Sequence, residues 1–217
     1  MVHSSRGLTG NPIRHASMLA KEASTLTTMD YIDVSLCWPA RSDAVGIRVV
    51  AHRTGEAVAR FGITGHMNLT PESVPLIRKA ITDVLAPYAG EEMTGVSCIA
   101  RGADSIFAQT VLDLGGKLEV VLPATSYRET KVKPDDAPVF DALLCQATTV
   151  RVMPFAEANR DAYEAANKAV LASCDLLLAV WDGQGPADRG GTAAVVKDAR
   201  TRGLAVKVIW PDGARRG

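Results

Sequence analysis

The sequence predicts an α/β protein in which a mostly parallel sheet of about six strands lies between two layers of helices, preceded by an irregular N-terminal extension. The first observation behind this prediction is a series of short, almost continuous apolar runs, which are typical of strands buried on both faces. The second is that segments with helical periodicity separate these runs, and strand–helix alternation produces parallel sheets. The third is that glycine-bearing loops follow several runs, where α/β proteins bind ligands.

Residues 1–58 are the predicted extension. They are rich in Ser, Thr, Arg and Ala, and they show no sustained apolar periodicity. A brief alternation over residues 31–36 is compatible with a short strand, which Trp38-Pro39 would end. We expect residues 1–58 to be flexible or loosely docked and residues 59–213 to form the folded domain.

Six runs of about five residues each define the strands that we predict. They are Arg60–Thr64, Gly95–Ile99, Leu118–Leu122, Thr149–Met153, Leu176–Val180 and Ala205–Trp210. Because these runs are apolar at almost every position, they indicate strands that helices cover on both faces.

Helices are predicted between the strands. Thr70-Pro71-Glu72 begins the first, since it combines a capping hydroxyl, a proline at the first helical position and an acid in the first turn. The others span residues 103–114, 161–173 and 192–202, and glycines follow the first and last of these three. This order of elements predicts a Rossmann-like, three-layer α/β/α domain.

The bulk composition narrows the range of partners. The chain has 24 basic and 24 acidic residues, so its net charge is zero and no global field favours nucleic acid or an anionic membrane. It contains no apolar run of about 18 residues, and its N-terminus lacks a signal-peptide pattern. No cysteine pair has metal-ligand spacing. We therefore expect a cytoplasmic protein without a nucleic-acid, membrane or metal partner.

The first glycine-bearing loop follows the first predicted strand. Gly62 and Gly65 permit tight turns, Thr64 offers a hydroxyl to a phosphate oxygen, and His66 is a further donor. Gly-x-x-Gly also occurs in purely structural turns, and it is not the six-residue dinucleotide motif. For His66, a ligand contact and an ordinary polar loop position are both compatible with the sequence.

The second loop opens the second helix. Gly102 and Ala103 would let a ligand approach the backbone closely, and Arg101 suits bidentate pairing with a phosphate. Asp104 has two interpretations: it complements the helix dipole in the first turn, or it binds ribose hydroxyls or orients Arg101.

The third loop carries the most specific pattern. Two glycines before a threonine at a helix start present N–H donors and a hydroxyl, an arrangement that suits phosphate. A tryptophan at the strand tip would stack on a base or pack against the end of the sheet. The candidate ligand-binding residues of this loop are Trp181, Asp182, Gly183, Arg189, Gly190, Gly191 and Thr192.

Because the carboxyl ends of parallel strands share one edge, the three loops predict one phosphate-bearing ligand held from three sides. A weaker candidate, Tyr127 with Arg128, follows the third strand at the same edge.

These motifs resemble the SLOG superfamily, the Rossmann-like group that includes the LOG phosphoribohydrolases and DNA-processing protein A. The resemblance covers about residues 59–213 and is closest to the branch with a Gly-Thr-Gly-His-type first loop and a Gly-Gly-Thr third loop. It implies a pocket for a nucleotide or nucleotide-like ligand, no other cofactor, and pairing into a homodimer through helices beside the sheet. The segments that carry it are 62–69, 99–104, 121–123, 179–183 and 189–192.

One departure from the family bears on catalysis. LOG enzymes remove the base from a nucleoside 5′-monophosphate with the help of a glutamate one turn into the helix after the third loop. Here that turn contains Ala194, and Asp198 is the first carboxylate after Thr192. Six positions turn a helix by roughly 600°, so we expect Asp198 to face away from the loop. The sequence therefore favours binding or sensing of a nucleotide-derived ligand, with no catalytic residue assigned. The alternative is a LOG-like phosphoribohydrolase (an N-glycosidase) in which Asp182 or Asp104 replaces the glutamate.

Overall fold

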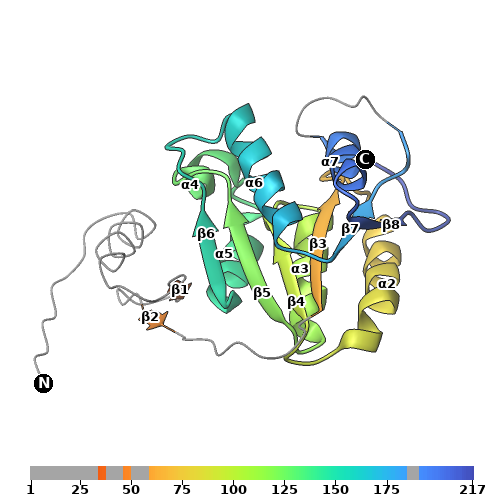
Figure 1. Ribbon diagram of the computed structural model, residues 1–217, viewed down its shortest axis with the longest axis horizontal. Coiled ribbons are helices and arrows are strands. Elements are labelled where there is room, and N and C mark those ends of the chain that lie inside the picture. The colour runs from red at the N-terminus through yellow and green to blue at the C-terminus, as the bar shows by residue number, and fades with distance from the viewer. Residues whose placement is uncertain (1–33, 38–45, 50–58, 185–190) are drawn as a thin grey trace, which may run out of the picture.

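A computed structural model describes residues 34–37, 46–49, 59–184 and 191–217. It contains a six-stranded parallel sheet with helices on both faces, which confirms the predicted fold class (Figure 1). Each strand overlaps one of the predicted apolar runs. The strands are β3 (Arg60–Gly65), β4 (Thr94–Ser97), β5 (Lys117–Leu122), β6 (Thr149–Val152), β7 (Leu176–Val180) and β8 (Ala205–Ile209).

The order of the strands fixes where the sheet reverses. The order is β6-β5-β4-β3-β7-β8, and every neighbouring pair is parallel. The chain enters the sheet at β3, moves outward through β4 and β5 to β6, and then returns to β7 and β8 on the other side of β3. The switch point therefore lies between β3 and β7, and the loops that leave these two strands are neighbours at the carboxyl edge.

Helices cover both faces of the sheet (Figure 1). One face carries α2 (Ser73–Leu85), α3 (Ala103–Asp113) and α5 (Ala137–Gln146), and the other carries α6 (Arg160–Ala172) and α7 (Thr192–Thr201). We did not predict α5 or the short helix α4 (Tyr127–Lys131) before it. In the described residues, no helix is both long and apolar enough to cross a membrane.

The core forms where these helices meet the central strands. Ile77 and Ile81 of α2 are fully buried, and they join Phe107 of α3 in one cluster with β3. On the opposite face, Ala166 and Val170 of α6 pack on the sheet. Helices cover both faces of the sheet, so a ligand can reach polar groups of the sheet mainly at its edges.

The C-terminal residues pair with the start of α2. Helix α2 begins at Ser73, two residues later than predicted, because the preceding loop binds the tail of the chain. The Thr70 N–H donates to the Arg215 carbonyl (3.1 Å), and the Arg215 N–H donates to the buried Ser73 hydroxyl (2.7 Å). Further along, the Gly217 N–H donates to the Asn68 carbonyl (2.8 Å), and the Asn68 amide donates to the Gly217 carbonyl (2.9 Å).

Two strands precede the main sheet. β1 (Val34–Cys37) and β2 (Gly46–Val49) pair with each other in an antiparallel sheet of their own. β1 overlaps the short strand expected over residues 31–36. The remainder of the predicted extension, residues 1–33, 38–45 and 50–58, lies outside the described residues.

Candidate functional site

The loops that follow β3 and β4 pack tightly against each other at the carboxyl edge. The Ala103 N–H donates to the His66 carbonyl (3.1 Å) at the point where α3 begins. Gly102 has a φ of 84°, and a Cβ there would lie 2.7 Å from the His66 carbonyl oxygen. A Cβ on Gly65 would lie 2.5 Å from the Ala103 Cβ. These two glycines are therefore explained by contact between the loops.

Three residues of the predicted first loop belong to the strand instead, with Gly65 as its last residue. Gly62 lies inside β3, and a Cβ there would lie 2.6 Å from the Cys174 sulfur, so this glycine lets the segment after α6 approach the sheet. Thr64 is paired with Ala179 of β7 and is 9% exposed. The structure thus separates Gly62 from the edge at which Gly65, His66 and Gly102 meet.

The switch point between β3 and β7 is occupied by protein side chains. Nε2 of the His66 ring lies 3.1 Å from Asp182 Oδ1, within hydrogen-bond distance, and Arg216 Nε donates to Asp182 Oδ2 (2.9 Å). The Gln184 N–H donates to Asp182 Oδ1 (2.8 Å), and the His66 and Trp210 rings pack in a T-shaped pair. Sequence reasoning offered His66 and Asp182 to a ligand, whereas the fold pairs them with each other.

The electrostatics of Asp182 agree with this pairing. Burial acts to raise its pKa, but the hydrogen bonds from the Gln184 N–H and His66, with the charge of Arg216, outweigh burial and hold the pKa below its usual value. The ionised carboxylate is therefore the form that the folded state prefers.

An Asp182→Asn substitution should destabilise the fold by about 2 kcal/mol at pH 7, since charge-assisted hydrogen bonds are lost. A lowered pKa stabilises the folded state above the pKa of the unfolded chain, and this contribution disappears as the pH falls. The difference between variant and parent should therefore shrink below about pH 4. Urea unfolding at several pH values measures it, with Asp212→Asn at an exposed position as the control. A difference that does not depend on pH would contradict the ionic role.

The third loop is described only in part. Trp181 and Gly183 follow β7, and the Trp181 indole N–H donates to the Gln184 carbonyl (2.8 Å) beside a shallow groove against α7. Gly191 and Thr192 stand at the N-terminus of α7. The remaining predicted residues of this loop, Arg189 and Gly190, lie outside the described residues.

Helix α7 offers no acid to that edge. Its first turn carries no acidic residue, and the Asp198 carboxylate forms a bidentate pair with Arg202 (2.8 and 2.9 Å). The absence of a LOG-type glutamate near Ala194 therefore holds in the folded helix.

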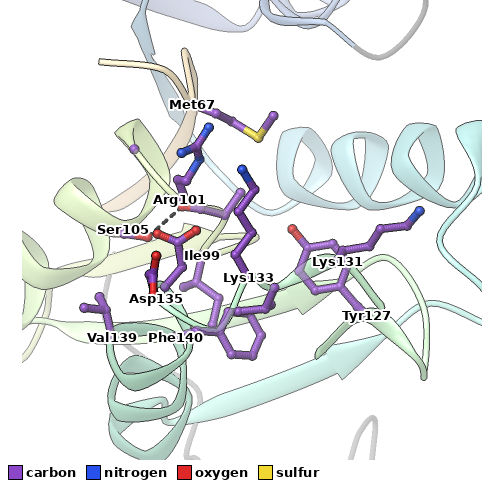
Figure 2. Close-up of a pocket in the computed structure, with 14 residues that line it drawn as sticks. Met67, Ile99, Arg101, Ser105, Tyr127, Lys131, Lys133, Asp135, Val139 and Phe140 are labelled. Atoms are coloured by element: carbon purple, nitrogen blue, oxygen red, sulfur yellow. Dashed lines mark hydrogen bonds between the residues drawn. The ribbon is translucent and has the colours of Figure 1, made fainter. Parts of the chain in front are cut away.

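A pocket opens beside β4, one strand away from the occupied switch point. It has a volume of about 250 Å³ and lies between the β4–α3 loop, α4 and the start of α5 (Figure 2). Arg101 and Gly102 of the predicted second loop line it, together with Met67 of the first. Tyr127 lines it too, whereas Arg128 is bound in a bidentate pair with Asp141 (2.6 and 2.7 Å).

The backbone of the β4–α3 loop is strained where it forms the pocket. Ile99 has a φ of 47°, in the left-handed region that β-branched residues rarely adopt. The Ile99 N–H donates to the Ser97 hydroxyl (2.9 Å), and the Ser105 hydroxyl donates to the Ala100 carbonyl (2.6 Å), so both flanks of the strained residue are held. Strain that the surroundings maintain in this way is concentrated at functional sites.

Two cations of the pocket are not paired within the part of the protein that the structure describes. Arg101 and Lys133 have no hydrogen-bond or ion-pair partner for their side chains among the described residues. Elsewhere, Arg60 pairs with Glu119 (2.6 Å), and Lys79 pairs with Asp83 (2.7 Å). The pocket therefore presents positive charge that no protein carboxylate neutralises directly, which is a favourable arrangement for an anion.

Asp104 does not line this pocket. It occupies the first turn of α3, as the helix-dipole interpretation predicts. Burial raises the pKa of Asp104 to about 7, although the backbone N–H groups of Ala100 and Cys98 oppose that shift. Burial and then the charge of Asp104 also raise the pKa values of the Cys98 thiol and the Tyr127 hydroxyl. A carboxyl group in these surroundings favours its neutral form.

Sequence reasoning missed the far side of the pocket. Lys131, Lys133, Asp135 and Val139 lie on or between α4 and α5, in a segment without a recognised motif. The available signal was their position after β5, since that segment leaves the carboxyl edge of the sheet, where ligands bind.

Comparison with known proteins supports the fold. No protein-family model and no curated protein matches the chain. Among solved structures, DNA processing protein A from Helicobacter pylori aligns with a TM-score of 0.53 at 16% identity, over 73% of this chain and 69% of that one. DNA processing protein A from Streptococcus pneumoniae aligns with a TM-score of 0.54 at 16% identity, over 71% of this chain. The aligned part spans 51% of the Streptococcus protein, about half its length. The resemblance to SLOG-type Rossmann-like proteins is thus confirmed at the level of the fold.

One expectation about partners is corrected by this comparison. The structure of the Helicobacter protein is described as revealing a single-stranded DNA binding mode, so a protein with this fold binds nucleic acid. The expectation that no nucleic acid is bound was wrong, because it relied on the net charge of the whole chain. A zero net charge does not prevent unpaired cations such as Arg101 and Lys133 from gathering at one place.

Proposed function

We propose that this protein binds or senses a nucleotide or nucleotide-derived ligand at the carboxyl edge of its sheet, and that Arg101 holds a phosphate of that ligand. The observation that carries this proposal is the unpaired Arg101 guanidinium in the wall of the pocket, next to the N-terminus of α3. A guanidinium suits bidentate contact with phosphate, and the start of a helix favours negative charge. The single-stranded DNA of the Helicobacter protein is itself a chain of nucleotides, which supports this ligand class.

The phosphoribohydrolase alternative is not favoured by any group described at the edge. Expulsion of a base through a cation-like transition state requires a carboxylate beside the sugar. The Asp182 carboxylate already accepts hydrogen bonds from three groups, and burial favours the neutral form of Asp104. Binding is therefore the function that we propose.

The proposal is tested by the thermal stability of the full chain with a panel of ligands. The panel contains AMP, ADP-ribose, NAD, cyclic dinucleotides and a short single-stranded oligonucleotide. A ligand at about 100 times its dissociation constant stabilises the folded state by about 2.7 kcal/mol, which raises the melting temperature by several degrees.

An Arg101→Ala variant should lose most of that stabilisation. Removing charge-assisted bonds to a phosphate costs about 1.5–3 kcal/mol, so we expect affinity to fall by roughly 10- to 150-fold. Arg78→Ala is the matched control, since Arg78 is an exposed arginine on α2 whose only partner is Asp113 (3.4 Å) among the described contacts. If no nucleotide stabilises the parent, or if both variants respond alike, the proposal is refuted.

A further inference from the structure

We infer that the ligand is a mononucleotide-sized organic phosphate, with its ring inside the pocket beside β4 and its phosphate at the mouth between Arg101 and Lys133. This inference rests on the proposed function and adds the place, the size and the orientation of the ligand. It moves the ligand's ring away from the switch point, towards residues of α4 and α5 that no motif indicated.

The occupancy of the switch point is the first reason. His66, Asp182 and Arg216 contact one another at the carboxyl ends of β3 and β7, through a hydrogen bond and an ion pair that share the Asp182 carboxylate. A ligand ring placed there would have to displace an ion pair and leave a nearly buried carboxylate without donors, which is costly. The pocket beside β4 requires no such displacement.

The size of the pocket limits the ligand. Sites that enclose whole drug-sized ligands have volumes of about 300–1,000 Å³. A volume of about 250 Å³ lies just below that range, so it accommodates one ring system with part of a sugar. A dinucleotide would have to leave its second half in solvent.

The wall of the pocket is divided between apolar and charged groups. Ile99, Tyr127 and Phe140 supply apolar surface, and the two aromatic rings lie 6.0 Å apart. Figure 2 shows the Arg101 guanidinium and the Lys133 ammonium together on the side near Met67, away from the Phe140 ring. A ligand that is apolar at one end and anionic at the other matches this division.

The acidic residues of the pocket narrow the chemical class of the ligand further. Asp135 and Asp136 lie beside the cations, so the lining carries three basic and two acidic side chains. A ligand that is only an anion would use the cations and leave these two carboxylates without partners. A ligand that also presents hydroxyl or amino donors, as a nucleoside does, can use both signs of charge.

The strain at Ile99 points to the same place independently. Its left-handed backbone places a fully buried branched side chain in the wall of the pocket, and two serine hydroxyls hold the loop in that shape. A conformation that costs of order 1–3 kcal/mol is maintained at the one loop that also carries Arg101. The strain does not stabilise the loop itself, so we attribute the shape of the loop to ligand binding.

The test compares three probes on the full chain by calorimetric titration. AMP carries both ring and phosphate, ribose 5-phosphate lacks the ring, and adenosine lacks the phosphate. We expect AMP to bind about tenfold more tightly than ribose 5-phosphate, because a ring in contact with aromatic side chains adds that much. We also expect AMP to bind at least tenfold more tightly than adenosine.

Two variants test the contacts of the ring and the contacts of the phosphate separately. Val139→Trp adds an indole from α5, on a part of the pocket wall away from the Arg101 guanidinium (Figure 2); Val139 is 51% exposed, so the fold should tolerate the change. It should remove the advantage of AMP over ribose 5-phosphate and leave ribose 5-phosphate within about threefold. Lys133→Ala should instead weaken AMP and ribose 5-phosphate together, by about tenfold, and leave adenosine unchanged. The controls are Val208→Trp and Lys207→Ala on β8, which are also exposed and do not line the pocket.

The outcomes distinguish this inference from the function on which it rests. If Arg101→Ala weakens AMP but Val139→Trp does not, the protein binds nucleotides with the ring elsewhere, and the inference alone is overturned. If NAD binds as tightly as AMP and both lose affinity in Lys133→Ala but not in Val139→Trp, the size and ring assignments are overturned. If none of the probes or nucleotides binds, both the inference and the proposed function are overturned.

Discussion

A Gly102→Ala substitution is expected to destabilise the domain by roughly 4 kcal/mol, from backbone strain and steric overlap combined. The φ of 84° at Gly102 lies in the region that only glycine adopts readily. In addition, the new Cβ would lie 2.7 Å from the His66 carbonyl oxygen and 2.8 Å from the Met67 Cα. These are backbone atoms, so no rotamer change relieves the overlap. Such a loss is a large part of the roughly 5–15 kcal/mol that stabilises a typical domain.

Gly203→Ala is the matched control for this prediction. Gly203 has a φ of 74° at the end of α7, but a Cβ there would have no atom within 4 Å. It therefore carries the conformational cost of about 1 kcal/mol without the overlap. Urea unfolding followed by circular dichroism measures both variants. Equal losses in the two would show that the loops after β3 and β4 are not in the close contact described.

An Asp104→Asn substitution is expected to abolish a pH dependence of stability. The folded state holds the proton of Asp104 up to about pH 7, whereas the unfolded chain releases it near pH 3.8, the usual pKa of an aspartate. Between these values the folded state binds more protons, so stability falls as the pH rises. Each pKa unit corresponds to 1.36 kcal/mol, so the parent should lose about 3 kcal/mol relative to the variant between pH 5 and pH 8.

The variant keeps the shape of the side chain and removes its charge. Cys98 and Tyr127, whose pKa values the charge of Asp104 also raises, both titrate above pH 8 in the folded state. Between pH 5 and pH 8 the difference between the free energies of unfolding of the two proteins therefore reports mainly on position 104. Asp113→Asn, which removes an exposed carboxylate of the same helix, is the matched control for the substitution. If Asp104→Asn behaves like Asp113→Asn, the carboxyl of Asp104 is better solvated than its surroundings indicate.

The strands and long helices were predictable because burial leaves a local signal. A strand covered on both faces must be apolar at nearly every position, and a helix on a sheet must be apolar at every third or fourth. β7 coincides with its predicted run, and α3 lies within its predicted range. The helix α4 was not predicted, because its five residues are too few for a period to emerge.

The site was harder to predict, because the sequence around a residue does not show which distant residue it will pair with. His66 and Asp182 have the chemistry of ligand-binding residues, and only the fold reveals that they bind each other and Arg216. The two glycines of the first motif look alike in the sequence. The fold separates Gly62, inside a strand, from Gly65, against the start of α3.

Arg101 is the part of the site that sequence reasoning placed at the edge where a pocket is found. Its position follows from local rules, since it comes after a buried strand and before a helix. Its partner at the mouth, Lys133, sits in a segment between two short helices, where polar residues are ordinary. Lys133 has no ion-pair partner among the described residues, and only the three-dimensional structure reveals this.

The pairing of the C-terminal tail with the loop after β3 also bears on how the domain folds. The hydrogen bonds of Ser73 to Arg215 and of Asn68 to Gly217 join positions 142 and 149 residues apart. Contacts of such separation form only after the intervening chain has been ordered, which slows folding and makes it cooperative. The loop after β3 and the C-terminal residues are therefore bound to each other, and together they hold the domain as one folding unit. Amide protons of Thr70 and Gly217 should exchange with solvent at similar rates, because the same local opening exposes both.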